Sequence, residues 1–287
     1  MSTLTNPHAP FDPLLTAAFE ANIVAAIAED VGTGDVTGRL VPEQEWVKAQ
    51  VVVREAAVLC GAPWFEGVMT ELDARIKIDW KYAEGALMAA DSVVCTIEAP
   101  ARALLTAERP ALNFLQLFSG VASATRRYVD VIAGTRAAIL DTRKTLPGLR
   151  LAQKYAVRVG GGKNQRMALY DGILIKENHI AAAGGVSAAM HAALALHAGV
   201  SIQIEVENLA ELQDALAAGA TSVLLDNFSL ELMREAVRLT AGRAILEASG
   251  GVNMDSVRAI AETGVDRISI GSLTKDVKAT DYSLRIV

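Results

Sequence analysis

Three cationic side chains lie within eight residues in the stretch Asp141–Arg150, which holds Arg143, Lys144 and Arg150 around a Pro-Gly turn. The stretch follows directly after a short apolar run. Arginine offers a planar fork and lysine a mobile point charge, and both bind carboxylates and phosphates. The pattern favours an anion-binding loop, and a solvated loop without a ligand is the simpler alternative.

Further cations follow downstream. The glycine run Gly160–Gly162 precedes Arg166, but glycines after a helix are most often a C-cap and turn, so the run alone is weak evidence for phosphate binding. Lys176 is more informative, because the apolar run Gly172–Ile175 before it indicates a buried strand. A lysine at such a strand end usually has an anionic partner, unless it reaches solvent along its apolar stem.

Carboxylates also follow apolar runs. Glu205 and Glu207 are two residues apart in one expected strand, so both side chains are expected on the same face. Asp226 ends the next run. Together they could hold a ribose diol or, directly or through water, Mg²⁺ that accompanies a pyrophosphate. Ordinary ion pairing with the nearby cations is the alternative.

Small residues follow the last two apolar runs, at Ser249-Gly250-Gly251 and Gly271-Ser272. Loops of this kind often seat a phosphate on backbone N–H groups, although glycines of tight turns have the same composition.

Two single residues are ambiguous from the sequence. His179 fits a catalytic base or a hydrogen-bonded structural residue, and the structural role is favoured. Arg109 is a lone cation in an apolar helical region, and this pattern alone does not mark it as functional.

Two patterns of apolar residues position these side chains. Leu15, Phe19, Ile23 and Ile27 repeat every four residues, which predicts an amphipathic helix that ends before Gly32. Strands of a small sheet are expected at Val51–Val53, Ile76–Trp80 and Val93–Ile97. A long helix is expected from about Leu104, and the end of the chain, Ala279–Val287, alternates like a strand that could join this sheet.

Beyond the long helix, short apolar runs recur every ~20 to 35 residues, and Ala-rich helical segments lie between them. This period predicts βα units and a parallel barrel, whose site lies at the carboxyl ends of the strands. The runs are Ala138–Leu140, Ile173–Ile175, Ile202–Val206, Val223–Leu225, Ile245–Leu246 and Ile268–Ile270.

Composition excludes several classes of protein. The 27 basic and 33 acidic residues give a net charge of −6, so no general attraction to nucleic acid or anionic lipid is expected. Charged residues interrupt every apolar run before it reaches ~18 residues, and Met1–Pro13 lacks the pattern of a leader, so we expect a cytoplasmic protein with no membrane span. Cys60 and Cys95 are expected to be buried thiols.

Eight stretches, in this order along the chain, resemble motifs of the quinolinate phosphoribosyltransferases, also called carboxylating nicotinate-nucleotide pyrophosphorylases. The resemblance runs from about Glu29 to Ser272. The stretches are Glu29-Asp30-x-Gly-x-Gly34-Asp35-Val-Thr37, Glu108-Arg109 with Ala111-Leu-Asn113-Phe-Leu-Gln116, Asp141-Thr-Arg-Lys-Thr-x-Pro-Gly-Leu-Arg150, Gly160-Gly-Gly-x-Asn164-x-Arg166, Leu174-Ile-Lys176-x-Asn178-His179, Glu205-Val-Glu207, Leu225-Asp226-Asn-Phe228 and Glu247-Ala-Ser249-Gly-Gly251.

The resemblance implies an α/β fold, namely an incomplete α/β barrel with an N-terminal α/β sandwich domain. We expect the sandwich at 1–115, with 275–287 as a candidate extra strand, and the catalytic barrel at 116–274. The resemblance also implies a homodimer in which Arg109 of one subunit reaches into the neighbouring site.

By motif position the resemblance implies that cations bind the carboxylates of quinolinate and the phosphates of phosphoribosyl pyrophosphate. These are Arg143, Lys144, Arg166 and Lys176, with Thr142 and Gln165 beside them.

The resemblance places Glu205 and Asp226 near the ribose hydroxyls and Mg²⁺. With Lys144 and Lys176 they are the candidate catalytic residues. The residues expected near the 5′-phosphate are Ser249, Gly250, Gly271 and Ser272, and Gly251 is a further candidate substrate-binding residue.

The chain departs from the family pattern in three places. Gln165 stands where family members often have histidine, so a charged imidazole contact is not expected while a hydrogen-bond donor remains. Leu146 replaces a common threonine. Pro110 disfavours helical backbone at Arg109, so we expect the helix to start there, with proline in its first turn.

The implied reaction joins the nitrogen of quinolinate to C1 of phosphoribosyl pyrophosphate, releases pyrophosphate, and then removes the carboxyl group next to that nitrogen. The product is nicotinate mononucleotide, for de novo NAD synthesis. Three alternatives stay open: a paralogous barrel associated with molybdate transport, a Schiff-base lyase that uses Lys176, and a non-catalytic phosphate-binding barrel. Lys176 with Asn178-His179 favours quinolinate over the paralogue, which lacks the matching lysine.

Overall fold

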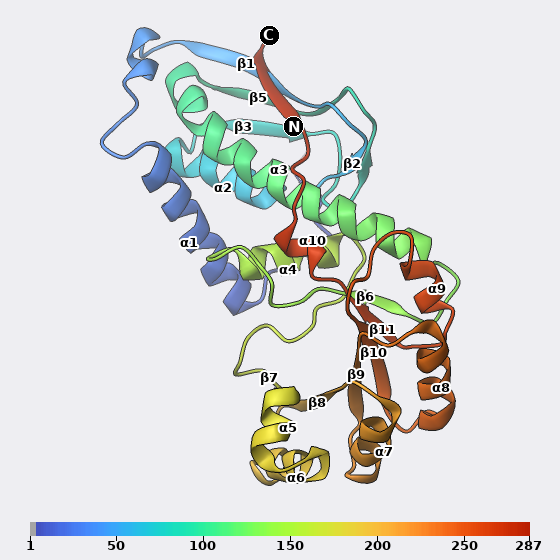
Figure 1. Cartoon of the computed structure of the whole chain (residues 1–287). Helices are drawn as coiled ribbons and strands as arrows, with labels where there is room; N and C mark the ends of the chain where they lie inside the picture. Colours follow the sequence, from blue (N-terminus) through green and yellow to red (C-terminus); the bar gives the residue numbers. More distant parts are fainter. Residues whose placement is uncertain (1–3) are drawn as a thin grey trace. The chain divides into compact units, whose positions relative to one another are not determined.

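The structure is a computed structural model that describes residues 4–287 (Figure 1). Residues 1–3, the start of the segment expected to lack a leader, lie outside the described residues. Backbone contacts group the chain into two units: one takes in residues up to 126, 145–161 and 273–287, and the other takes in 127–144 and 162–272. These units differ in extent from the expected domains, 1–115 and 116–274.

The first unit contains a four-stranded antiparallel sheet with the strand order β12-β1-β5-β3. The expected extra strand is confirmed, because β12 pairs with β1 and sets Leu284 opposite Val51. The strands are β1 (Trp46–Val53), β3 (Lys77–Trp80), β5 (Ser92–Pro100) and β12 (Tyr282–Ile286), and a separate pair is formed by β2 (Ala57–Val58) and β4 (Leu87–Met88).

The expected helix near the N-terminus is confirmed as α1 (Pro13–Asp30), in which Leu15 and Ile23 of the predicted apolar repeat are buried. Its first turn is stabilised by Asp12, whose side chain accepts a hydrogen bond from the Leu15 N–H at 2.9 Å. The other helical elements with residues in this unit are the 3₁₀ helix η1 (Thr37–Leu40), α2 (Ala62–Leu72), α3 (Ala101–Val131), α4 (Arg150–Val159) and α10 (Ser272–Lys275).

Helix α3 begins earlier than expected. The prediction that it starts at Pro110 is wrong, because the helix begins at Ala101 and contains Pro110 in its interior. An internal proline removes one backbone hydrogen bond and costs about 3 kcal/mol. Leu104 and Leu115, on either side of it, are fully buried, and burying one leucine contributes about 1.5–3 kcal/mol. Tertiary packing therefore outweighs the local preference of proline.

The packing of α3 against α4 explains the glycine run. A Cβ on Gly160 would lie 2.5 Å from the carbonyl oxygen of Ala122, so only glycine permits this close approach. Gly160 is the C-cap of α4, and Gly161 has a positive φ of 93°. The interpretation of the run as a helix end and turn is therefore confirmed.

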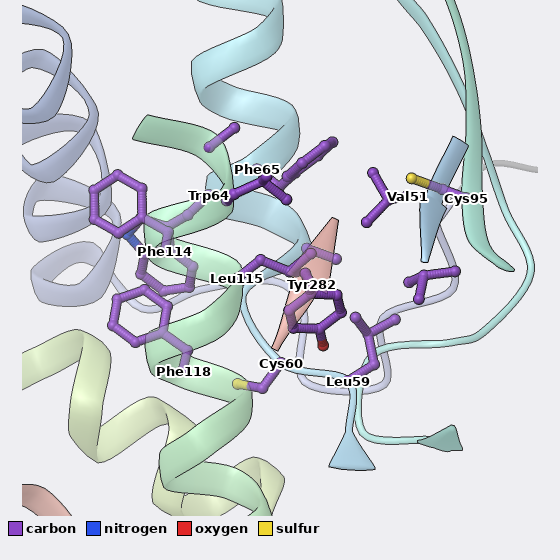
Figure 2. Close-up of a cluster of buried hydrophobic side chains, with 14 of the residues drawn as sticks. Val51, Leu59, Cys60, Trp64, Phe65, Cys95, Phe114, Leu115, Phe118 and Tyr282 are labelled. Atoms are coloured by element: carbon purple, nitrogen blue, oxygen red, sulfur yellow. The ribbon is translucent and has the colours of Figure 1, made fainter. Parts of the chain in front are cut away.

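An aromatic cluster fills the core of the first unit (Figure 2). The Trp64 ring packs edge-on against Phe118, with 5.0 Å between the ring centroids, and lies 5.3 Å from Tyr155. Cys60 and Cys95 are free and buried, as expected.

The second unit contains six parallel strands in the order β6-β11-β10-β9-β8-β7, which confirms the incomplete α/β barrel. All six apolar runs of the sequence correspond to these strands. They are β6 (Ala138–Leu140), β7 (Gly172–Ile175), β8 (Ser201–Val206), β9 (Ser222–Asp226), β10 (Ile245–Ser249) and β11 (Arg267–Ser269).

Helices connect most of these strands and lie along the outside of the sheet (Figure 1). Local capping sets where they begin. The Asn208 side chain accepts from the Glu211 N–H, and the Glu211 side chain accepts from the Glu207 N–H, so the turn after β8 is fixed. The helices are α5 (Glu177–Ala183), α6 (Val186–Ala195), α7 (Leu209–Ala217), α8 (Leu230–Thr240) and α9 (Val257–Ala261).

None of the helices within residues 4–287 combines the length and apolar character needed to cross a membrane.

The first unit also contains a buried carboxylate, Glu84. It accepts hydrogen bonds from the backbone N–H groups of Gly61 at 2.8 Å and Ala62 at 3.2 Å, at the start of α2, and from the Tyr155 hydroxyl at 3.0 Å. Burial raises the pKa of Glu84 to about 7, although these donors oppose the shift. The carboxyl group is therefore easier to protonate in the folded protein than in the unfolded chain.

This shift predicts a pH-dependent free energy of unfolding. Because the folded pKa is raised, the contribution of Glu84 is fully present below about pH 4.5 and is lost as pH rises through about 7, by about 3 kcal/mol. In the Glu84→Gln variant this component is absent. Urea unfolding from pH 5 to 8.5 should therefore show the variant gaining stability relative to the parent protein as pH rises.

The matched control is Glu71→Gln, at an exposed position near the end of α2. Its stability relative to the parent should not change with pH. A constant difference between Glu84→Gln and the parent across this range would contradict the prediction.

Candidate active site

The segment 163–166 closes the gap between the edge strands β6 and β7. Its first residue forms an isolated parallel bridge with β6. Asp141, which directly follows β6, is fully buried and accepts hydrogen bonds from the Gln165 backbone N–H at 3.0 Å and from the Asn164 side chain. On the other side, Arg166 donates to the Gly172 carbonyl of β7 at 3.0 Å. The segment therefore enters the barrel as an irregular seventh element.

A cavity of about 300 Å³ lies at the carboxyl ends of the barrel strands. Nine of the residues predicted for the site line it. They are Thr142, Arg143, Lys144, Gln165, Arg166, Lys176, Glu205, Asp226 and Ser249. The barrel unit alone thus gathers four cations and two carboxylates from five parts of the sequence.

Two part-buried arginines, Arg143 and Arg166, line this cavity. The Nε atoms of Arg143 and Arg166 are both buried and have no hydrogen-bond partner within residues 4–287. Burial, and then the charge of Arg143, lower the pKa of Arg166, while Asp171 raises it. A carboxylate or phosphate would relieve this repulsion and accept from these donors.

Lys176 has the expected anionic partner. Its Nζ lies 3.8 Å from Oε2 of Glu205, and its side chain remains about half exposed. Burial raises the pKa of Glu205, the charge of Lys176 lowers it, and the nearby charge of Asp226 raises it again. The two carboxylates are therefore close enough to repel each other, and cations stabilise the pair.

The expectation that Glu205 and Glu207 share one strand face is wrong. β8 ends at Val206, and Glu207 is exposed in the turn before α7. The capping interaction with Glu211 ends the strand there.

Of the small residues expected near a phosphate, Ser249 lines the cavity, and Gly250, Gly251, Gly271 and Ser272 are not among its lining residues. Gly271 still lies close to it, because a Cβ there would be 3.0 Å from Cδ of Lys144. Gly250 has a positive φ of 104°, and a Cβ would lie 2.1 Å from the Asn227 side chain. Conformation and space both require glycine at this position.

The two ambiguous residues lie elsewhere. His179 accepts a hydrogen bond from the Lys176 backbone N–H through Nδ1 at 3.0 Å, which is the structural role favoured from the sequence. Arg109 is exposed on α3, in a segment that belongs to the other unit.

Sequence reasoning did not select four residues that line the cavity: Leu174, Leu224, Glu247 and Ser269. Strand alternation could have found Glu247, because it lies two residues before Ser249 and so faces the same side of β10. Burial is the largest influence on Glu247 and raises its pKa, and hydrogen bonds from Gln203 and Ser269 lower it.

Within residues 4–287, no group of three or more His, Cys, Asp or Glu side chains is arranged to hold a metal ion. Glu205 and Asp226 together remain compatible with Mg²⁺, which is commonly bound by one or two carboxylates together with substrate phosphates.

Two family models match the chain. The N-terminal domain model of quinolinate phosphoribosyl transferase matches residues 35–119, and the C-terminal domain model matches residues 121–285.

Relatives share this similarity over most of their length. The probable nicotinate-nucleotide pyrophosphorylase [carboxylating] of Bacillus subtilis is 39% identical, over 90% of both chains. The nicotinate-nucleotide pyrophosphorylase [carboxylating] of Mycobacterium leprae is 40% identical, over 90% of this chain and 94% of that protein.

A solved structure is similar across the whole fold. The nicotinate-nucleotide pyrophosphorylase of Francisella tularensis has a TM-score of 0.92 and 42% identity, and the match covers 97% of this chain and all of that one. With both domain models matched and relatives similar over nine-tenths of its length, the chain belongs to the quinolinate phosphoribosyl transferase family.

Proposed function

We propose that this chain is a decarboxylating quinolinate phosphoribosyltransferase, a pentosyltransferase of de novo NAD synthesis. It converts quinolinate and phosphoribosyl pyrophosphate to nicotinate mononucleotide, carbon dioxide and pyrophosphate. The observation that carries the proposal is one cavity that combines four cations with three carboxyl groups, those of Glu205, Asp226 and Glu247, at the carboxyl ends of the barrel strands. The names of the relatives support the same reaction.

The cations bind the substrates. Quinolinate carries two carboxylates and phosphoribosyl pyrophosphate carries several phosphate charges, so the cavity must compensate a large negative charge. Arg143 and Arg166 supply the planar donors, and Lys144 and Lys176 supply point charges. Holding both substrates in line replaces a bimolecular encounter with an oriented reaction.

The first step forms the bond between the quinolinate nitrogen and C1 of the ribose, while the bond from C1 to the pyrophosphate oxygen breaks. Positive charge develops at C1, as in glycoside cleavage. Glu205 and Asp226 are proposed to lie near the ribose, where their negative charge stabilises this carbon and their oxygens accept from its hydroxyls. Lysine and arginine stabilise the departing pyrophosphate.

The second step breaks the bond between the ring carbon and the carboxylate next to the nitrogen. The electron pair stays on the ring carbon, where the newly cationic nitrogen stabilises it, and the carbon then takes up a proton. Neither step needs a nucleophilic side chain. The protein supplies orientation and charge.

We also propose that Mg²⁺ accompanies the pyrophosphate, with Glu205 and Asp226 as its contacts, directly or through water. When bound, Mg²⁺ would neutralise the leaving group. The mutual repulsion of the two carboxylates is the feature that supports a cation there.

We further propose a homodimer in which Arg109 completes the site of the neighbouring subunit. Support comes from the position of Arg109, an exposed cation on α3 directly before the buried Pro110. A cytoplasmic location stays a prediction.

The first prediction concerns the reaction itself. Purified protein mixed with quinolinate, phosphoribosyl pyrophosphate and Mg²⁺ should release pyrophosphate and carbon dioxide, and nicotinate in place of quinolinate should release neither. Coupled phosphate detection and trapping of labelled carbon dioxide measure the two products. Tight substrate binding without either product would identify a non-catalytic barrel instead.

The second prediction concerns Lys176. Lys176→Met keeps an unbranched side chain out to Cε and removes the charged Nζ, so kcat/KM for pyrophosphate release should fall on the order of 10²- to 10³-fold. Lys48→Met, at an exposed position of β1, is the control and should retain full activity.

Borohydride treatment in the presence of substrates should leave the parent enzyme active, whereas loss of activity would favour a Schiff-base lyase.

The third prediction concerns Arg109. Arg109→Met and Lys176→Met homodimers should both be nearly inactive. A heterodimer of the two, isolated with two different tags, contains one intact site if Arg109 acts across the interface, so it should recover about half of the parent activity.

The control heterodimer combines Arg143→Met with Lys176→Met. Both residues line the same cavity of one barrel, so no intact site can form and activity should stay absent. An inactive Arg109→Met and Lys176→Met heterodimer would show that Arg109 acts within its own subunit.

A further inference from the structure

Two buried side chains, Gln203 and Glu247, and the part-buried Gln165 form a hydrogen-bonded chain at the active-site cavity. The Gln165 side-chain NH₂ donates to Oε1 of Gln203 at 3.0 Å, and the Gln203 NH₂ donates to Oε2 of Glu247 at 3.0 Å. Gln203 is 7% exposed and Glu247 is 1% exposed. We name these three residues the amide relay.

The members of the amide relay lie at different depths in the barrel. Gln165 and Glu247 line the active-site cavity. Gln203 lies two residues before Glu205 on β8, and it lines a second cavity of about 500 Å³ towards the amino ends of the strands, which shares Gln165, Arg166 and Glu247 with the first. Gln203 is not among the residues that line the active-site cavity, whereas both of its hydrogen-bond partners, Gln165 and Glu247, are.

Glu247 sets the direction of the relay. The Gln203 NH₂ group donates to Oε2 of Glu247, which leaves the Gln203 carbonyl oxygen to accept from Gln165. Gln165 must then present its own NH₂ group to Gln203. Without Glu247, either amide could rotate by half a turn and exchange donor for acceptor.

We infer that Gln203 and Glu247 are positioning residues, which hold the Gln165 amide in the orientation that recognises a carboxylate of the pyridine substrate. The inference rests on the proposed function. The fixed NH₂ nitrogen has a second hydrogen, which is the donor a carboxylate needs, whereas a reversed amide would set a carbonyl oxygen against the carboxylate. The relay thus makes the neutral Gln165 side chain selective for anions. A cation at the same position would have this selectivity through its charge.

A double-mutant cycle tests the inference. Methionine replaces glutamine with similar length and no hydrogen bonds, so the variants are Gln165→Met, Gln203→Met and the double variant. Each single variant should raise KM for quinolinate on the order of fivefold, equivalent to one hydrogen bond, and should leave KM for phosphoribosyl pyrophosphate unchanged. The double variant should be no worse than Gln165→Met alone, because Gln203 acts only through Gln165.

A second variant keeps the test decisive if Gln203→Met does not fold. Glu247→Gln preserves the shape but can donate as well as accept, so it should raise KM for quinolinate about two- to fivefold in the parent and not at all in the Gln165→Met background. Gln213→Met, at an exposed position on α7, is the matched control and should change neither KM.

The outcomes separate this inference from the proposed function. If the parent enzyme releases no product from quinolinate, the proposed function and the relay both fail. If the parent is active but Gln203→Met leaves KM for quinolinate unchanged, or if the double variant multiplies the two single effects, only the positioning role is overturned.

Discussion

The buried carboxylate of Asp141 is the interaction on which the candidate site most depends. The edge strands of the second unit's sheet are β6 and β7, and within residues 4–287 the segment 163–166 pairs with β6 through a single β-bridge. Asp141 compensates by accepting from the Gln165 backbone and the Asn164 side chain. A buried charge is stable only when such donors surround it, so the carboxylate and the segment fix each other. Arg143, two residues after Asp141, and Arg166, one residue after Gln165, therefore enter the same cavity.

The barrel interior separates charges by depth. Residues at positions i and i+2 of a strand face the same side, so Gln203 lies below Glu205 on β8, and Glu247 lies below Ser249 on β10. Carboxylates of the active-site cavity come from strands, where the backbone is rigid. Three of its four cations, Arg143, Lys144 and Arg166, lie between β6 and β7 and outside the strands. Their long side chains can adapt to the substrate. This division places the carboxylates on the rigid elements of the barrel, which hold a functional group more precisely than loops do.

Much of this architecture was predictable from local sequence. The six apolar runs gave the barrel strands, and strand ends marked Lys176, Glu205 and Asp226, because period and burial are encoded within a few residues. Local sequence patterns did not predict features that depend on contacts between residues far apart in the sequence. Pro110 lies inside α3 because buried neighbours outweigh its backbone penalty. The hydrogen bonds from Gln165 to Gln203 and from Gln203 to Glu247 each join residues about forty positions apart, and no local pattern pairs them.

Gln165 shows how charge and orientation can substitute for each other. Arg143 and Arg166 already repel each other at the cavity, as the lowered pKa of Arg166 indicates. An additional unit charge about 4 Å away would add roughly 1–4 kcal/mol of repulsion before any substrate binds. A neutral amide avoids this cost but loses the long-range attraction of a cation, which acts in any orientation. An amide attracts a carboxylate only when its N–H points toward it. Gln165 therefore needs a hydrogen-bond partner that fixes the orientation of its amide, and Glu247 provides this through Gln203. A cation in place of Gln165 would not need such a partner.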